Sequence, residues 1–229
     1  MKCGKGPRAP RRYGDGRVLV NSMAALCLCL TLAAPGAALA GPAPRILAFG
    51  DSLTAGLGLN PDAAFPARLE AVLRSDGIDA RVINGGVSGE TTAGGIARLD
   101  WALGDHPDLV ILELGANDAL RGIDPKLAYA NLDKILARLK ASGAKVLLTG
   151  MLAPPNWGRD YQQEFAAIFP TLAGKYDVPL YPFFLDGVAM DPSLNQPDGL
   201  HPNAKGAALI AAKVAPYVER LLKGETATP

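Results

Sequence analysis

The chain has 229 residues, of which 49% are hydrophobic, and its 23 lysine and arginine residues nearly balance its 22 aspartate and glutamate residues. A chain of this length can bury one sizeable core, so a single domain is expected. The balanced charge argues against a nucleic-acid-binding protein, because such proteins concentrate basic residues on one face. Here the basic residues cluster only at the amino terminus.

Residues 1–40 have the pattern of a secretory signal peptide. Basic residues precede an apolar run over residues 23–34, and Pro35-Gly36 follows it. This run is shorter than the ~20 residues of a membrane-spanning helix, so no stable membrane span is expected after processing. We predict cleavage near Ala40 and a periplasmic or secreted protein. Met1 is taken as the start, with Met23 as the alternative.

The predicted mature domain, residues 41–229, differs in composition from the whole chain. Residues 1–40 hold all three cysteines, six basic residues and one acidic residue. The remaining 17 basic and 21 acidic residues give a formal charge of −4. No thiol remains for a disulfide, so the fold must hold by packing. With two histidines and no cysteine as soft ligands, we expect no metal and no cofactor.

Five short apolar runs, each followed by turn residues, are typical of buried parallel strands. In chain order they are Arg45–Phe49, Ala80–Asn84, Asp108–Leu114, Lys145–Met151 and Val178–Phe184. Helical patterns separate them, which predicts a doubly wound α/β fold with right-handed crossovers. We expect a flavodoxin-like three-layer α/β/α sandwich around a five-stranded parallel sheet with the strand order 2-1-3-4-5.

Two of the predicted helices have informative boundaries. Between Pro125 and Ser142 the apolar residues fall on one stripe, and Gly143 is a suitable stop. The members of this stripe are Leu127, Leu132, Ile135, Leu136 and Leu139. The last helix begins near Asn203 and contains Pro216, which we expect to kink it or end it early.

Candidate catalytic residues follow the strands at one edge of the predicted sheet, where ligand sites form. Ser52 lies on a sharp turn after the first strand, and Asp198 and His201 precede the last helix. A serine nucleophile needs a base with a near-neutral pKa, and histidine supplies one. The carboxylate of Asp198 would fix the tautomer of His201. These residues predict a Ser/His/Asp triad for acyl transfer.

The oxyanion of a tetrahedral intermediate needs hydrogen-bond donors that already point at it. The candidates are the backbone N–H groups of Ser52 and Gly89 and the side-chain amide of Asn117. Gly86, in the same glycine-rich segment after the second strand, is the alternative to Gly89. Asp118 is left outside the site because a carboxylate would oppose the developing charge, and a turn or capping role is expected for it.

Four segments of the chain resemble the four blocks of the GDSL, or SGNH, hydrolases. They are Gly50-Asp51-Ser52-Leu53, the glycine-rich segment with Ser88-Gly89-Glu90-Thr91, Gly115-Ala116-Asn117-Asp118, and Asp198-Gly199-Leu200-His201-Pro202. Their order and spacing also match, and the resemblance covers Arg45 to the last helix. It is strongest to the secreted bacterial branch of thioesterases, lysophospholipases and arylesterases.

The resemblance implies a single SGNH-type hydrolase domain over residues 41–229. It implies that Ser52 is the nucleophile, that Asp198 and His201 complete the triad, and that Gly89 and Asn117 are oxyanion donors. The expected function is hydrolysis of carboxylic esters or thioesters, such as aryl esters, acyl-CoA and lysophospholipids, through an acyl-enzyme. The alternatives are a carbohydrate acetylesterase on the same scaffold and a non-catalytic flavodoxin-like binding module. A monomer is the default oligomeric state.

Some residues outside the triad are also assigned at this point. Candidates for an acyl groove beside the site are Leu57, Trp157, Tyr161, Phe165 and Met190, and the alternative for each is ordinary packing in the core. The second histidine, His106, lies just before the third predicted strand, and we expect it in a solvated loop at the opposite edge of the sheet.

Overall fold

A computed structural model describes residues 42–225 of the chain. The predicted signal peptide and its cleavage site lie outside the described residues. Among the helices described here, none combines the length and the apolar character needed to cross a membrane.

The centre of the fold is a five-stranded sheet in the order β2-β1-β3-β4-β5, and every pairing in it is parallel. This arrangement confirms the predicted fold class and strand order. The strands are β1 Arg45–Gly50, β2 Arg81–Gly86, β3 Leu109–Glu113, β4 Lys145–Thr149 and β5 Leu180–Tyr181.

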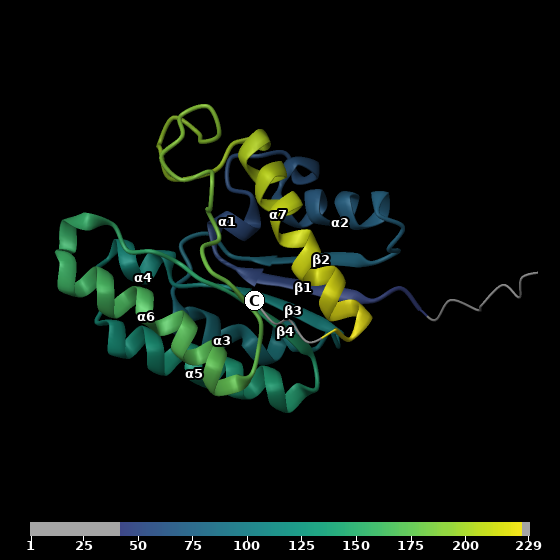
Figure 1. Cartoon of the computed structure of the whole chain (residues 1–229), viewed down its shortest axis with the longest axis horizontal. Coiled ribbons are helices and arrows are strands. Elements are labelled where there is room, and N and C mark those ends of the chain that lie inside the picture. Colours follow the sequence, from purple (N-terminus) through teal and green to yellow (C-terminus); the bar gives the residue numbers. More distant parts are fainter. Residues whose placement is uncertain (1–41, 226–229) are drawn as a thin grey trace, which may run out of the picture. The chain divides into compact units, whose positions relative to one another are not determined.

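Helices cover both faces of the sheet, as Figure 1 shows. Helices α2 (Phe65–Ser75) and α7 (Ala204–Lys223) pack together on one face. The other face carries α3 (Thr92–Leu103), α5 (Pro125–Ser142) and α6 (Arg159–Tyr176). Short helices follow the strands: α1 Ser52–Ala55, η1 Pro61–Ala63, α4 Ala116–Leu120 and η2 Pro155–Trp157.

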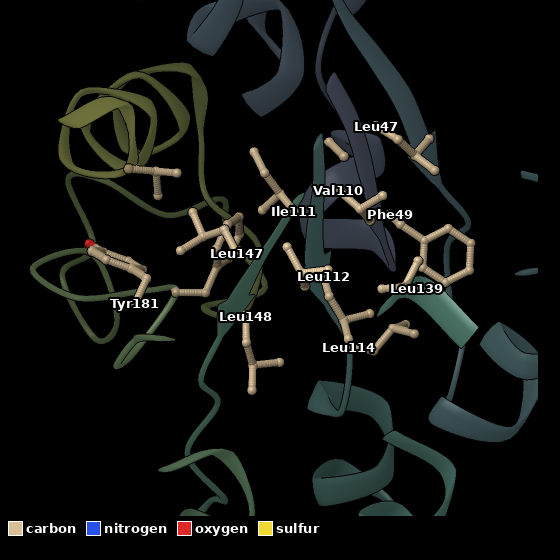
Figure 2. Packing of buried hydrophobic residues seen from close by; sticks show 14 of the residues in the cluster. Leu47, Phe49, Val110, Ile111, Leu112, Leu114, Leu139, Leu147, Leu148 and Tyr181 are labelled. Atoms are coloured by element: carbon tan, nitrogen blue, oxygen red, sulfur yellow. The ribbon is translucent and has the colours of Figure 1, made fainter. Parts of the chain in front are cut away.

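The central strand β3 is buried along its whole length because both of its faces meet helices. Its residues Val110, Ile111 and Leu112 lie among side chains of the neighbouring strands, as Figure 2 shows. The same burial explains why the strands appear in the sequence as continuous apolar runs. Because the strand is packed on both faces, its carboxyl end, where the candidate catalytic residues are expected, has a fixed position.

All five strands differ from the predicted ranges by at least one residue, and two of the differences have clear local reasons. Strand β5 has two residues instead of the seven predicted over 178–184, because Pro179 and Pro182 flank it and have no N–H for the ladder. Strand β2 extends to Gly86, two residues beyond the predicted end. Gly86 fits there because a Cβ would collide with the backbone of Ala55.

Helix α7 continues through Pro216 to Lys223, so the prediction that it ends early was wrong. Proline removes the N–H that would bond to the carbonyl of Ala212, four residues earlier. Both residues are solvent-exposed, so water can hydrate that carbonyl. The opposite side of the helix is buried and packs on α2, which keeps the helix in place. Helix α5 has the predicted limits, but Leu127 is 58% exposed and does not belong to its buried stripe.

Candidate active site

Ser52 is the first residue of α1, directly after the sharp turn that ends β1. Asp51 caps this short helix, and its Oδ1 accepts a hydrogen bond from the N–H of Leu53 at 2.9 Å. Gly50 is required at the turn, because a Cβ there would collide with Thr54 Oγ1 and the carboxyl group of Glu113. The serine hydroxyl is therefore presented at the carboxyl edge of the sheet.

The loop before α7 is held by hydrogen bonds within the loop and by one to the segment after α1. Asn195 and Pro202 form an antiparallel bridge, and the N–H of Gln196 donates to the carbonyl of His201 at 2.7 Å. The Gln196 side-chain amide donates to the carbonyl of Leu57 at 2.7 Å and to that of Pro202 at 3.0 Å. This glutamine, which sequence reasoning missed, brings the histidine loop against the serine helix.

The structure brings Ser52, His201 and Asp198 together in one chain of contacts. Ser52 Oγ lies 2.9 Å from His201 Nε2, although 149 positions separate the two residues. On the other side of the ring, His201 Nδ1 lies 2.6 Å from Asp198 Oδ2. When Nδ1–H donates to the carboxylate, Nε2 keeps its lone pair toward the serine hydroxyl. Such an arrangement can remove a proton from Ser52.

The carboxylate of Asp198 is held by the backbone of its own loop. Its Oδ1 accepts the N–H of Leu200 at 2.9 Å and that of His201 at 3.0 Å. These backbone hydrogen bonds, from His201 and then Leu200, and the side-chain hydrogen bond from His201 lower the pKa of Asp198 to about 2. Asp198 is therefore ionised at any pH at which the enzyme would be assayed.

Besides the N–H of Ser52, the candidate oxyanion donors come from α4 and from the glycine-rich segment at the end of β2. Asn117, in the first turn of α4, lines the same groove as Ser52, and its Nδ2 donates to Asp51 Oδ2 at 3.0 Å. The N–H of Gly86 donates to Asn84 Oδ1 at 3.0 Å and is therefore engaged within its own loop. Gly89 has a φ of 80°, and its carbonyl accepts from Arg121. These contacts favour Gly89 over Gly86 as the backbone donor.

Glu113, the last residue of β3, lies fully buried behind the serine turn. Its Oε2 accepts the N–H of Asp51 at 3.2 Å and the hydroxyl of Thr54 at 2.8 Å. Burial raises the pKa of Asp51 to about 6. Burial, and then repulsion from Asp51, raise the pKa of Glu113 well above its usual range. Asp51 belongs to a recognised motif, whereas the only sequence signal for Glu113 was its place near the end of an apolar run.

The stability of the protein should depend on pH through Asp51 and Glu113. As the pH rises above about 4, the unfolded chain releases these carboxyl protons while the folded chain keeps them. The free energy of unfolding should then fall as the pH rises through 6, the pKa of Asp51, and beyond. Urea unfolding of the protein and of Glu113→Gln between pH 4 and 8 measures this. The variant should show the shallower decline, and equal slopes would contradict the assignment.

A groove of about 390 Å³ opens beside Ser52 and His201. Its walls are mostly apolar and come from α4 and from the loops after β4 and β5. The residues that line it include Leu120, Met151, Leu152, Ala153, Pro154, Pro155, Phe183, Leu185, Ala189, Met190 and Leu200. Such a surface fits a hydrocarbon chain next to the serine hydroxyl.

The predicted groove residues are only partly in this position. Met190 lines the groove, and Leu57 lines a smaller hollow on the Phe65 side of Ser52. Phe165 is buried in the core, and Tyr161 donates its hydroxyl proton to the carbonyl of Ile123. For Phe165 the alternative of ordinary core packing therefore holds, because the inner side of α6 faces the core.

Two residues that were not assigned to the site, Asp118 and His106, lie where they serve the fold or face the solvent. Asp118 is buried, and its two oxygens accept the N–H and the hydroxyl of Thr92, at the start of α3. His106 is exposed in the loop before β3 and lines a hollow with Pro107 and Lys145. These positions match the capping and solvated-loop roles expected for them.

The chain is similar to known esterases over most of its length. The model of the GDSL-like lipase/acylhydrolase family matches residues 48–209. An arylesterase of Vibrio mimicus is 44% identical over 172 residues, which are 75% of this chain and 86% of the relative. The thioesterase 1/protease 1/lysophospholipase L1 of Escherichia coli K12 is 40% identical, covering 82% and 89%. The crystal structure of AlinE4, an SGNH-hydrolase family esterase, is 49% identical with a TM-score of 0.68, covering 80% of this chain and 98% of its own.

Proposed function

Because this chain belongs to the GDSL-like lipase/acylhydrolase family and is an enzyme that acts on ester bonds, we propose that it is a secreted serine hydrolase of esters and thioesters. It would form an acyl-enzyme on Ser52. The observation that carries this proposal is the contact chain from Ser52 through His201 to Asp198, at 2.9 and 2.6 Å.

In the proposed mechanism, His201 Nε2 takes the proton of Ser52 as Oγ attacks the substrate carbonyl carbon. The N–H groups of Ser52 and Gly89 and the amide of Asn117 stabilise the oxyanion that forms. His201 then gives its proton to the leaving alcohol or thiol, and the acyl group stays on Ser52. Water, deprotonated by the same imidazole, releases the acid and restores the serine.

The proposed substrates carry an acyl chain rather than a bare acetyl group. The groove next to Ser52 is apolar and large enough for several methylenes, each of which is worth about 0.8 kcal/mol when buried. The names of the relatives, arylesterase and thioesterase 1/lysophospholipase L1, point to aryl esters, acyl thioesters and lysophospholipids as the substrates to test.

Rates on p-nitrophenyl esters from acetyl to palmitoyl, beside acyl-CoA and lysophospholipid, test the proposal. We expect kcat/KM to rise with chain length to a medium-chain optimum. A sharp preference for acetyl groups on sugars would instead indicate a carbohydrate acetylesterase. Tight ligand binding without any fluorophosphonate adduct on Ser52 would indicate a binding module.

Filling the groove should change chain-length preference and leave short esters unaffected. Ala189 lines the groove, so Ala189→Phe should displace about two methylenes of a decanoyl chain. At about 0.8 kcal/mol per methylene, kcat/KM on p-nitrophenyl decanoate should fall about tenfold relative to the acetate. Ala189→Ser, which adds almost no volume, is the control. An unchanged ratio in Ala189→Phe would mean that the chain binds elsewhere.

The proposed location outside the cytoplasm depends on residues 1–40. Expression of the full chain in a Gram-negative host, followed by fractionation and amino-terminal sequencing, tests it. We expect a processed protein that begins near residue 41. Recovery of the uncut chain from the cytoplasm alone would contradict secretion.

A further inference from the structure

We propose that Glu113 is a positioning residue that acts as a neutral acid and, through Asp51, holds the side-chain amide of Asn117 in the orientation that donates to the oxyanion. This inference rests on the oxyanion role proposed above for Asn117. Glu113 itself touches neither Ser52 Oγ nor the groove. Its effect must therefore pass through the contacts between β3, the serine turn and α4.

The surroundings of Glu113 favour the protonated form. The residue has no exposed surface, and no cation of the described residues pairs with it. Its Oε1 is buried and has no hydrogen-bond partner among the described atoms. An ionised oxygen there would carry a large desolvation cost, so the proton belongs on this carboxyl group.

The groups around this carboxyl do not offer it a counter-charge. Arg98, on α3, uses its guanidinium group to pair with Glu90 and to donate to the carbonyl of Gly50 at 2.9 Å. The ring nitrogens of His201 face Ser52 and Asp198, and neither contacts Glu113. Asp51 is the nearest ionisable group and repels a charge on Glu113. One negative charge, on Asp51, is what this site can hold at neutral pH.

Asp51 links Glu113 to Asn117 because its backbone N–H and both of its carboxylate oxygens are hydrogen-bonded. Its N–H donates to Glu113 Oε2 at 3.2 Å, and its Oδ1 accepts from Leu53. Its remaining oxygen, Oδ2, faces Asn117 Nδ2 at 3.0 Å. An amide group is nearly symmetric in shape, so only its partners select which end faces where. A carboxylate oxygen selects the NH2 end and leaves the second N–H for the groove.

The neutral form of Glu113 suits this task better than the ionised form. A neutral carboxyl group still accepts the N–H of Asp51 and the hydroxyl of Thr54 through Oε2. A second negative charge behind Ser52 would oppose the charge that develops on the substrate oxygen. A neutral Glu113 thus keeps the hydrogen bonds that position the turn and does not repel the negative charge of the transition state.

A double-mutant cycle tests the proposal with p-nitrophenyl butyrate, with active enzyme counted by fluorophosphonate titration. Asn117→Ala should lower kcat about 100-fold, as expected for an oxyanion donor. Glu113→Ala should lower kcat about 10-fold with KM within about twofold, because the oxyanion contact exists only in the transition state. The double variant should have nearly the kcat of Asn117→Ala alone. Glu113→Gln, a neutral isostere, should keep kcat within about threefold of the parent.

The proposal would be overturned if the loss of kcat in the double variant equalled the product of the two single losses. It would also be overturned if Glu113→Gln were as slow as Glu113→Ala. If Glu113→Ala does not fold, Thr54→Val replaces it in the cycle, because it removes the hydroxyl bonded to Oε2 and keeps the volume. A normal kcat in Asn117→Ala would overturn this inference together with the oxyanion role. If Asn117→Ala is slow but the losses of kcat at Asn117 and Glu113 are independent, this inference fails and the oxyanion role of Asn117 stands.

Discussion

Replacing Ser52 by alanine should lower kcat on p-nitrophenyl butyrate by about 10⁴- to 10⁶-fold, the loss typical of a missing serine nucleophile. The reason is local. Ser52 Oγ is the atom that His201 Nε2 faces at 2.9 Å, and no substitute hydroxyl follows it in α1 except Thr54, which donates to Glu113. Without Oγ, only the oxyanion donors and the groove remain to act on bound ester.

The fold should tolerate Ser52→Ala, because the cap of α1 is made by Asp51 and the Cβ atom is retained. Thermal unfolding should therefore occur within a few degrees of the parent protein. Ser75→Ala, which removes a surface hydroxyl bonded to the carbonyl of Val72, is the matched control and should keep full activity. Parent-like turnover in purified Ser52→Ala would end the assignment of the nucleophile.

The parts of the fold that sequence predicted well are those that repeat over many residues. Strand β3 was recognisable because four of its five positions are apolar and all five are buried, and α5 because its stripe ends at Gly143, where φ is 82°. The strand order followed from the alternation of strands and helices. The errors lie where one tertiary contact decides, as at Pro216, whose helix is held by packing against α2.

The candidate site was predictable to the extent that its residues belong to recognisable short motifs. Ser52, Asn117, Asp198 and His201 each follow a strand or precede a helix in such a motif. Glu113 and Gln196 do not, and neither residue type suggests a role on its own. Their importance comes from partners 62 and 139 positions away, Asp51 and Leu57. Contacts of that range depend on packing, which a single sequence does not display.

Replacing Asp198 by asparagine should lower kcat by about 10⁴-fold near neutral pH, because it fixes the wrong tautomer of His201. In the folded loop, Asp198 Oδ1 accepts two backbone N–H groups, from Leu200 and His201. An asparagine at this position must therefore place its carbonyl oxygen there. Its NH2 group then faces His201 Nδ1, where Asp198 Oδ2 now lies at 2.6 Å.

With an N–H donor facing Nδ1, the neutral imidazole of Asp198→Asn must carry its proton on Nε2, the nitrogen that faces Ser52. The ring can then donate to the serine hydroxyl but cannot take its proton, so both acylation and deacylation lose their base. Fluorophosphonate labelling of Ser52 should slow in parallel with kcat, while KM for the ester changes little. Asp186→Asn, at a surface ion pair with Lys213, is the matched control and should label at the parent rate. Fast labelling of Asp198→Asn would show that His201 keeps its working tautomer without this carboxylate.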